Sequence, residues 1–384
     1  KMKKIIKIIL LLTLTFSIFL GEVFAEEKIK IGLLVPLTGK NSEIGQSIIK
    51  STRLAINQID NLSIEIIPKD TASSPEVTLK SAKELEKLGI RIVIGPVFNE
   101  NLIYLNELSN LTFLSLTNKN DNRSSNIINA GINATSQLNA IKKFIELNEI
   151  KKTIFLTSDS NYKNEIIQAI SNSRIKIIEN YIYDRDPTKL TKQIEKITNY
   201  ERRKQNLEDE IKRLEESNEN NIEKLIERLK KKDTLGNVNF DSLIIADFDE
   251  SLKSVTTSLL YTDILPKEKY FITLNQWFDE SLLKETNLQP IYFPSINKEN
   301  YDNFSLEYFN KYNQYPNQLS FLSYDLIGLI YFLILQNESI INEKIFEKKI
   351  LFKGKVGIFE IKKNKINHIL NFYKVENKKF KKIF

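Results

Sequence analysis

The sequence contains no cysteine and a single histidine, His368, among its 384 residues. Disulfides, thiolate metal sites and Cys/His nucleophile pairs are therefore excluded. We interpret His368 as a strand surface residue, because it lies in the strand-like segment INHIL. The 11 glycines form no Gly-x-Ser-x-Gly motif, phosphate loop or Gly-x-Gly-x-x-Gly motif. The sequence thus gives no sign of an enzyme, and we expect neither a cofactor nor a metal.

Paired carboxylates are the remaining candidates for catalysis. Asp247 and Asp249 follow an apolar run and have the chemistry for acid–base work. Such pairs are also common at strand ends, and no partner motif accompanies this one. A transferase-like enzyme therefore stays a third alternative behind two binding functions.

The charge pattern does not indicate a nucleic-acid partner. The formal net charge is +7, but basic and acidic residues alternate along the chain instead of forming a basic face. The tail, with Lys378, Lys379, Lys381 and Lys382, is the one basic cluster, and we interpret it as a solvated terminus.

The first 25 residues are typical of a secretory signal peptide. A lysine-rich start precedes an apolar stretch at 8–20, and Val23-Phe24-Ala25 fits a cleavage site. The alternative is a single transmembrane anchor, for which the stretch is short. We expect an exported, soluble periplasmic protein that does not span the membrane after cleavage. A lipid anchor on cysteine is not expected, because the sequence has none.

Short apolar runs alternate with amphipathic stretches along most of the chain. Alternating strands and helices predict parallel sheets with right-handed crossovers. In residues 31–49, a strand, a turn and a helix start follow one another, and helix starts attract anions at the carboxyl ends of such strands. The expected strands are 31–35, 64–67, 91–94, 112–116, 153–157, 175–178, 242–246 and 270–274, and two of the expected helices are 76–88 and 135–147.

Residues 188–232 interrupt this alternation. They are charged, lack Gly and Pro, and carry apolar residues at spacings of three and four on both sides of a polar SNENN turn at 217–221. This spacing predicts an antiparallel coiled-coil hairpin. It is either an arm that binds a partner or a solvated spacer that packs only on itself.

Three motifs resemble one protein family. The segment IKIGLLVPLTGKNSEIGQSIIKSTRLAINQI resembles the opening of type I periplasmic binding proteins, the leucine/isoleucine/valine-binding class. GIRIVIGPVFNENLIYLNEL, with Gly95-Pro96, is similar to their second characteristic element, and SYDLIGLIYFLI at 323–334 to a late helix of the first lobe. The resemblance implies two doubly wound α/β lobes with a ligand cleft between them.

Further segments resemble the penicillin-binding protein activator branch of that class. They include NIINAGINATSQLNAIKKFI, FDSLIIADF and TLNQWFDESLL, and members of the branch often carry a charged helical insert before the second of these. The resemblance implies stimulation of a peptidoglycan synthase through protein contact. The alternative is the substrate-binding protein of an ABC importer for branched-chain or other amino acids, which hands its ligand to a permease.

In amino-acid-binding members of the class, hydroxyls and backbone amides hold the ligand carboxylate, an acidic residue holds the ammonium group and aromatic rings cover the side chain. The resemblance implies ligand-binding roles for Asn99, where a serine is typical, and for Ser115, Thr117 and Asn118. In the second lobe it implies Tyr162, and Asp247 or Glu250 for the ammonium group. At the cleft mouth it implies Gln276 and Trp277.

Each of these positions also has a structural alternative. Thr117 and Asn118 suit a turn, and Asp247 suits a helix cap. Tyr162 suits an apolar edge, and Trp277 suits interface packing.

The expected domain boundaries follow from the resemblance and from the hairpin. The signal peptide is 1–25, and the hairpin at 188–232 is inserted in lobe two. Lobe one takes 26–132 and 277–345, and lobe two takes 133–276 and 346–384.

Overall fold

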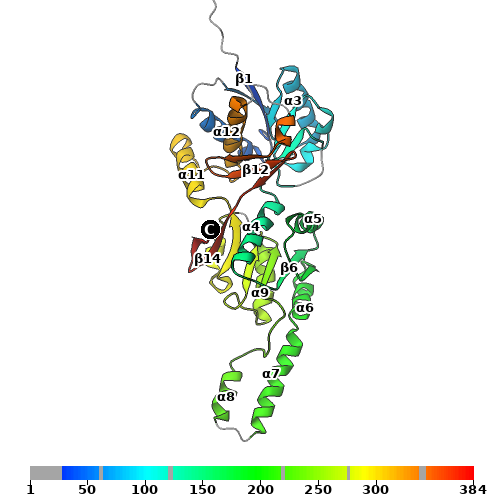
Figure 1. Ribbon diagram of the computed structural model, residues 1–384, viewed down its shortest axis with the longest axis vertical. Coiled ribbons are helices and arrows are strands. Elements are labelled where there is room, and N and C mark those ends of the chain that lie inside the picture. The colour runs from blue at the N-terminus through cyan, green and yellow to red at the C-terminus, as the bar shows by residue number, and fades with distance from the viewer. Residues whose placement is uncertain (1–27, 60–63, 120–123, 218–220, 275–276, 337–342) are drawn as a thin grey trace, which may run out of the picture.

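A computed structural model describes residues 28–59, 64–119, 124–217, 221–274, 277–336 and 343–384. The chain forms two α/β lobes stacked along the long axis of the molecule, and a helical hairpin extends from the second lobe (Figure 1). The predicted fold class, two lobes with largely parallel sheets, is confirmed. The expected signal peptide lies outside the described residues.

The sheet of lobe one has five strands, all parallel, in the order β2-β1-β3-β4-β5. Its two faces pack against different helices. Leu33 of β1 lies in one core with residues of α2 and α12, whereas the neighbouring Leu34 lies in another core with Leu85 of α3. Burial on both faces explains why β1 and β3 contain continuous apolar runs, whereas the edge strand β2 is only partly buried. The strands are β1 (Ile29–Val35), β2 (Ile64–Asp70), β3 (Ile92–Ile94), β4 (Thr112–Ser115) and β5 (Ile127–Asn129).

Two glycines bring backbone segments close to the carboxyl end of β1. A Cβ atom at Gly45 would lie 1.8 Å from the carbonyl oxygen of Pro36. A Cβ atom at Gly95, whose φ is +102°, would lie 2.1 Å from the carbonyl oxygen of Leu34. Only glycine permits both approaches, which set the start of α2 and the end of β3 above the first strand.

The helices of lobe one come from both halves of the sequence. Helix α12 is buried along almost its whole length, and its Ser320 Oγ lies 2.7 Å from Ser47 Oγ of α2. The expected late helix at 323–334 is therefore part of the first lobe. The elements are α2 (Ser42–Ile56), α3 (Pro75–Lys87), η1 (Asn99–Leu102), η2 (Leu105–Glu107), α11 (Lys298–Tyr312), α12 (Ser320–Gln336) and η4 (Glu343–Glu347).

A small antiparallel sheet, β11-β12-β13, completes lobe one. Its 354–357 turn is fixed to α12 by Asp325, which is 1 % exposed and accepts N–H bonds from Lys355, Val356 and Gly357. Burial raises the pKa of Asp325 to about 7, against the opposing effect of these amides. The strands are β11 (Ile350–Lys353), β12 (Ile358–Lys362) and β13 (Lys365–His368).

The sheet of lobe two has seven strands in the order β15-β14-β10-β9-β8-β6-β7. Strands β6 to β10 are parallel, and β14 and β15 extend the sheet in antiparallel fashion. The strands are β6 (Thr153–Ser158), β7 (Glu179–Tyr183), β8 (Ser242–Ala246), β9 (Tyr270–Thr273), β10 (Ile291–Ser295), β14 (Asn371–Glu376) and β15 (Lys379–Lys382). The helices are α4 (Ala134–Leu147), α5 (Lys163–Ser173), α6 (Pro187–Ile197), α9 (Asp249–Tyr261), α10 (Ser281–Lys284) and η3 (Thr286–Leu288).

The chain passes between the lobes three times, at 130–133, 296–297 and 369–370. The expected boundaries at 277 and 346 were wrong. Strand β10 pairs with β9 and β14 in lobe two, and β11–β13 packs on lobe one, where β13 contacts β5. A short apolar run has the same pattern in either sheet, and only its partner strands decide to which lobe it belongs.

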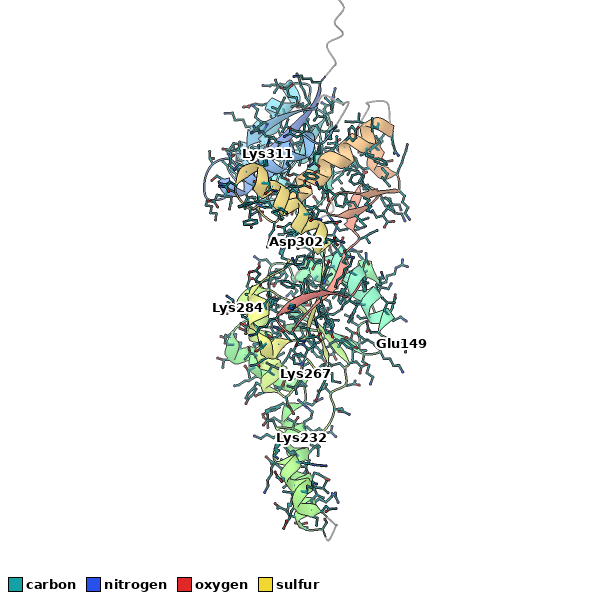
Figure 2. The ribbon with its side chains drawn as sticks, turned by 90° about the vertical axis from the view of Figure 1, so that its left-hand side faces the viewer. Glu149, Lys232, Lys267, Lys284, Asp302 and Lys311 are labelled. Carbon is teal, nitrogen blue, oxygen red and sulfur yellow. The ribbon has the colours of Figure 1, made fainter. Side chains whose placement is uncertain are left out.

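The hairpin consists of α7 (Tyr200–Glu215) and α8 (Ile222–Leu229), which pack on each other and project from the end of lobe two that is remote from lobe one (Figure 1). Lys232 marks the return of the chain to the lobe (Figure 2). Residues 188–197 do not belong to it, because α6 packs on α9 and buries Leu190 and Ile194 in the core of lobe two. The turn at 218–220 lies outside the described residues.

A buried arginine anchors the base of the hairpin. Arg203 donates from Nε to the Thr198 carbonyl at 2.9 Å and from Nη1 to Thr234 Oγ1 at 2.9 Å, and its Nη2 contacts the Thr262 carbonyl. Thr234 Oγ1 in turn donates to Asp263 at 2.7 Å. Burial lowers the pKa of Arg203, partly offset by the charge of Asp263.

Three local expectations differ from the structure. His368 lies on a strand but is 3 % exposed, because its ring packs edge-on against Phe359 and its Nε2 lies 2.8 Å from the Ala130 carbonyl. The basic tail forms β15 instead of a solvated end, since Lys381 pairs with Glu376 at 2.6 Å. The strand expected at 175–178 begins at Glu179, where pairing with Ile154 starts.

In the described part of the chain, none of the helices combines the length and the apolar character that a membrane crossing requires.

Candidate functional site

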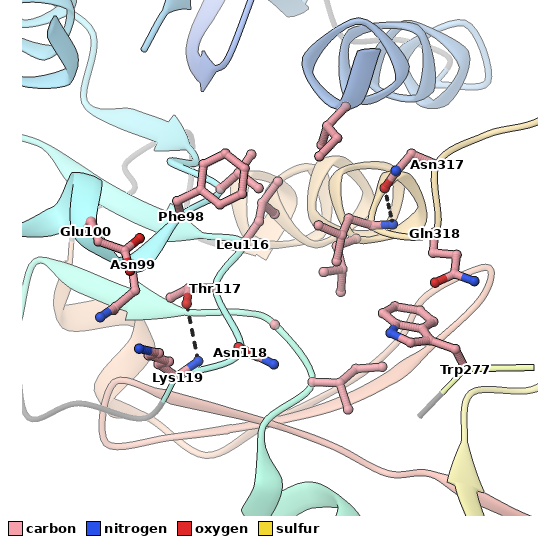
Figure 3. A pocket seen from close by; sticks show the side chains of 16 residues that line it. Phe98, Asn99, Glu100, Leu116, Thr117, Asn118, Lys119, Trp277, Asn317 and Gln318 are labelled. Carbon is pink, nitrogen blue, oxygen red and sulfur yellow. Dashed lines mark hydrogen bonds between the residues drawn. The ribbon is translucent and has the colours of Figure 1, made fainter. Parts of the chain in front are cut away.

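A cavity of about 520 Å³ lies at the carboxyl ends of the lobe-one strands, where the two lobes face each other. Most of its wall comes from lobe one, namely the segments after β3 and β4 and the loop before α12 (Figure 3). Trp277, which follows β9, is the residue of lobe two in this wall. The volume is that of a site for a small organic molecule.

Four of the expected positions line this cavity: Asn99, Thr117, Asn118 and Trp277. Ser115 lies beneath it, fully buried, where its Oγ donates to the Pro96 carbonyl at 3.3 Å and accepts from the Thr117 amide at 3.3 Å. Ser115 therefore shapes the floor, because its hydroxyl is already engaged. Thr117 Oγ1 accepts a hydrogen bond from the backbone amide of Lys119 at 3.3 Å. This contact is that of a turn, the structural alternative to ligand binding for this residue.

The cavity also holds charged side chains that the sequence did not single out, Glu100 and Lys119. Neither makes a hydrogen bond or ion pair with its side chain among the described residues, although both line one cavity. The side-chain amides of Asn118 and Gln318 also make no hydrogen bond within the described part of the chain. Glu100 and Lys119 lie at the same end of the cavity, away from Trp277 and Gln318 (Figure 3). The only sequence signal was adjacency, since Glu100 follows Asn99 and Lys119 follows Asn118.

The apolar part of the wall comes from both lobes. Phe98 and Leu116 follow β3 and β4, and Ile44 belongs to the first turn of α2. Trp277 covers the opposite side (Figure 3). The cavity thus combines a charged end with an apolar end, the arrangement that binds a small molecule with one polar and one apolar part.

Lobe two presents a compact polar cluster at the carboxyl ends of its own strands. Asp247, after β8, is fully buried and accepts from Tyr162 at 2.8 Å, from Tyr183 at 2.7 Å and from Arg185 Nη2 at 2.7 Å. The Arg185 guanidinium also lies 5.4 Å from the centre of the Tyr162 ring. The three partners come from β7 and from the turns after β6 and β7, so sheet order alone assembles the cluster.

This cluster is internally satisfied. Burial, followed by the hydrogen bonds and charge of Asp247, raises the pKa of Tyr162 and Tyr183. Burial lowers the pKa of Arg185, but the hydrogen bond and charge of Asp247 outweigh it and the net shift is upward. Asp247 is therefore committed to Arg185, and the exposed parts of the cluster are the guanidinium of Arg185 and the ring of Phe248 beside Tyr162.

One of the two remaining expected positions, Glu250, joins neither group. Glu250 is exposed on α9 and pairs with Lys253 at 3.0 Å. Gln276 lies outside the described residues. The structure thus brings Asn99, Thr117, Asn118 and Trp277 together in one cavity, and Tyr162 and Asp247 in a second cluster.

Within residues 28–384, apart from the gaps in the description, no three His, Cys, Asp or Glu side chains are grouped to hold an ion.

The comparisons with known proteins identify the fold. Residues 28–197 match the family described as Periplasmic binding protein. A search of curated protein sequences finds no significant match.

Solved structures share the fold at low identity. The leucine-binding protein LivK of Thermotoga maritima is 15% identical with a TM-score of 0.56, covering 93% of this chain and 98% of that one. The LpoA C-domain of Haemophilus influenzae, described as a regulator of PBP1A, is 14% identical with a TM-score of 0.60, covering 92% and 100%. An ABC-transporter solute-binding protein of R. palustris, in complex with 4-hydroxybenzoate, is 14% identical with a TM-score of 0.57, covering 93% and 96%. The resemblance to both groups that the sequence motifs indicated is therefore confirmed as a resemblance of fold.

Proposed function

Because the chain has the type I periplasmic-binding-protein fold, we propose that it is a non-enzymatic periplasmic binding protein whose interlobe cavity takes a small amino-acid-like solute. The observation that carries this proposal is the pair of opposite charges, Glu100 and Lys119, which line one cavity and whose side chains make no hydrogen bond or ion pair with the residues that the structure describes. The periplasmic location rests on the fold and on the expected signal peptide.

A zwitterion complements these two charges. Glu100 supplies a carboxylate for an ammonium group, and Lys119 supplies an ammonium group for a carboxylate. Charge-assisted hydrogen bonds of this kind are worth about 1.5–3 kcal/mol each. A molecule with a single charge leaves one of the two side chains unpaired, so the site discriminates in favour of a solute that carries both.

The apolar side of the solute then meets Phe98 and Trp277. Trp277 belongs to lobe two, and Arg185 and Phe248 are exposed on the face of that lobe. Closure of the lobes on a bound solute adds contacts that the open form lacks, so the solute stabilises the closed form. In the importer function, that closed form hands the solute to a permease.

The test uses matched pairs of solutes: leucine and its deaminated analogue 4-methylpentanoate, and phenylalanine and 3-phenylpropanoate. Binding is followed by isothermal titration calorimetry and by Trp277 fluorescence, which reports on the cavity because Trp277 is the only tryptophan. We expect an amino acid to bind at least tenfold more tightly than its deaminated analogue. Glu100→Gln should remove this preference, whereas Lys119→Met should weaken both members of a pair about 10- to 100-fold.

The control variant is Glu107→Gln, an exposed acid on η2 that does not line the cavity. It should bind as the unmodified protein does. Equal affinities for an amino acid and its deaminated analogue, or a Glu100→Gln variant that keeps the preference, contradict the zwitterion site.

The hairpin favours a second function, regulation of a peptidoglycan synthase by protein contact. Helices α7 and α8 project beyond lobe two, away from the cavity (Figures 1 and 2). Leu207 and Leu214 of α7 are buried, whereas α8 has no buried residue and its Leu225 is exposed, so the hairpin presents charged side chains and part of its apolar face to the surroundings. The similarity in fold to the LpoA C-domain supports a partner of that kind.

Replacing residues 208–231 by a short glycine–serine linker tests this function. The replacement keeps Arg203, Asn206 and Thr234, which hold the base of the hairpin to the lobe. Capture of a bifunctional peptidoglycan synthase from the source membrane by the unmodified protein, lost on replacement, is the expected result. Capture that is unchanged by the replacement contradicts a role of the hairpin, and an unchanged melting temperature shows that the lobes remain folded.

A further inference from the structure

The hairpin of α7 and α8 leaves part of its apolar surface uncovered. None of the residues of α8, Ile222–Leu229, is buried, and Leu225 is 36 % exposed. Its apolar residues nevertheless recur at spacings of three and four, so they form one face of the helix: Ile222, Leu225, Ile226 and Leu229. Each helix of a two-helix hairpin covers only one side of the other, whereas a bundle of four covers such faces completely.

The flanks of the hairpin are open to another molecule. Helix α8 packs on α7, and both project from the end of lobe two that is remote from lobe one (Figures 1 and 2). A chain that lies alongside them therefore does not meet the lobes that hold the solute cavity.

The exposed charges divide the hairpin into a basic base and an acidic tip. The base, next to lobe two, carries Arg202, Lys204, Arg228, Lys230 and Lys232. The tip, where α7 ends and α8 begins, carries Glu208, Asp209, Glu215, Glu216 and Glu223. None of these side chains forms an ion pair within the described part of the chain, since the two pairs of the hairpin join other residues, Arg213 to Glu210 and Lys231 to Glu227.

The remaining charges of the hairpin do not cancel this division. At the base, Glu201 and Asp233 are fewer than the cations, and towards the tip, Lys212 and Lys224 are fewer than the acids. The buried Arg203 belongs to the anchor and is not available to a partner.

A second copy of the same hairpin complements both features when it lies antiparallel. The acidic tip of each copy then lies beside the basic base of the other, and a twofold axis repeats the contact. A parallel arrangement would bring like charges together. The apolar faces of the two copies of α8 meet in the same arrangement, and the lobes of the two molecules lie at opposite ends.

We propose that the protein forms a twofold-symmetric dimer in which the hairpins of two copies pack as an antiparallel four-helix bundle. A second copy is favoured over an unrelated partner because the surface is complementary to itself in charge and apolar on the same helix. The inference does not rest on the solute site, and it leaves the solute cavities of both copies accessible. A peptidoglycan synthase would use the same surface, so the two occupants are separated by experiment.

Sedimentation equilibrium of the whole protein measures this association. We expect a monomer–dimer equilibrium with a dissociation constant of about 10 μM at low salt, as suits an interface at the small end of the usual range. Raising the salt concentration should weaken the dimer, because the paired charges are close to water and are screened. Small-angle scattering should give the dimer a much larger maximum dimension than the monomer, since the lobes lie at opposite ends.

Two charge-reversed variants test the antiparallel arrangement. Glu215→Lys/Glu216→Lys reverses the tip. Arg228→Glu/Lys232→Glu reverses the base, at positions three and seven residues beyond Leu225 and so on its face of α8. Each variant should weaken the dimer at least about 100-fold, because both symmetry-related contacts become repulsive.

An equimolar mixture of the two charge-reversed variants gives the sharpest result. In a mixed dimer the reversed tip of one molecule lies beside the reversed base of the other, so every contact again joins opposite charges. We expect the mixture to dimerise about as tightly as the unmodified protein, although neither variant does so alone. This recovery also shows that the hairpins of both variants are folded.

A third variant tests the apolar part, and a fourth is the control. Leu225→Ser should weaken the dimer about tenfold, because each copy loses a side chain that the bundle buries. Lys267→Glu/Lys284→Glu makes the same change in net charge as reversal of the base, but at exposed lysines of lobe two (Figure 2). This control should associate as the unmodified protein does.

Any of three results overturns the proposal. The first is a monomer at every concentration, which leaves the hairpin to a different partner. The second is a dimer that persists when residues 208–231 are replaced by the glycine–serine linker. The third is a pair of charge-reversed variants that fail to associate when mixed. Solute binding is measured separately, so none of these results bears on the solute cavity.

Discussion

Replacement of His368 by Gln should change how the stability of the protein depends on pH. Burial lowers the pKa of His368 to about 4, partly offset by the hydrogen bond to the Ala130 carbonyl. The physical cause is clear from its surroundings, since a proton on Nδ1 has no acceptor among the described residues. Gln cannot take up a proton, yet it retains an N–H group for that carbonyl.

The sign follows from proton uptake in the two states. In the unfolded chain the histidine has its ordinary pKa of 6.5, so on acidification it binds a proton before the folded protein does. The folded protein therefore loses stability as pH falls from 6.5 towards 4, and this contribution is fully present only above pH 6.5. At pH 5.0 the loss covers about 1.5 pKa units, or about 2 kcal/mol at 1.36 kcal/mol per unit.

The assay is urea unfolding of the unmodified protein and of His368→Gln at pH 7.5 and pH 5.0. The stability advantage of the unmodified protein over the variant should be smaller at pH 5.0 by about 2 kcal/mol. Comparison of the two proteins is needed, because Asp325 has its own pH effect in the same range. Since His368 is the only histidine, its NMR signal should titrate near pH 4 in the folded protein and near 6.5 in urea. A difference between the proteins that does not vary with pH would refute the reasoning.

Three further predictions concern buried charges. Arg185→Met removes the cation paired with the fully buried Asp247, and urea unfolding should show a loss of about 3 kcal/mol in the free energy of unfolding. The control is Lys189→Met, which breaks an exposed ion pair with Asp184 and should cost less than about 1 kcal/mol. Arg203→Met leaves the carbonyls of Thr198 and Thr262 without the arginine that donates to them. Limited proteolysis of this variant should therefore cut the hairpin before the lobes. Equal rates of hairpin cleavage in the variant and in the unmodified protein would argue against Arg203 as the anchor of the hairpin. Asp325→Asn replaces a titrating group beside the backbone amides of the 354–357 turn by one that does not titrate. Because the pKa of Asp325 is raised to about 7, the stability of the unmodified protein relative to this variant should fall by about 1.36 kcal/mol per pH unit as pH rises from 3.8 to 7, and a relative stability that rises instead would contradict the prediction.

Local patterns predicted most of the single elements. Continuous apolar runs indicated buried parallel strands, and those at 31–35, 64–67, 153–157 and 242–246 all lie within strands of the structure. Runs in central strands such as β1 and β8 are reliable because burial on both faces favours apolar residues at successive positions, whereas the run in the edge strand β2 is only partly buried. An apolar run does not indicate which strand it pairs with. The predicted lobe boundaries at 277 and 346 were wrong for this reason.

The candidate site was only partly predictable. Asn99, Thr117, Asn118 and Trp277 were singled out through the family resemblance, and they line one cavity. Glu100 and Lys119 belong to no recognisable motif. From the sequence alone, a charged residue on the open surface looks the same as a charged residue that lines a cavity without a partner. For Asp247, the sequence pointed to a ligand contact, but the order of β8, β6 and β7 brings Arg185 and two tyrosines to it.

The sequence by itself determined the number and kind of most elements, the inserted hairpin and the absence of thiol chemistry, because these depend on residue types and on spacing along the chain. Only the tertiary structure decided which lobe contains 277–295 and 346–368, that His368 is buried, and that Glu100, Lys119 and Trp277 line one cavity. These features depend on segments that are far apart in the sequence, and their free energies arise only when strand pairing brings those segments together.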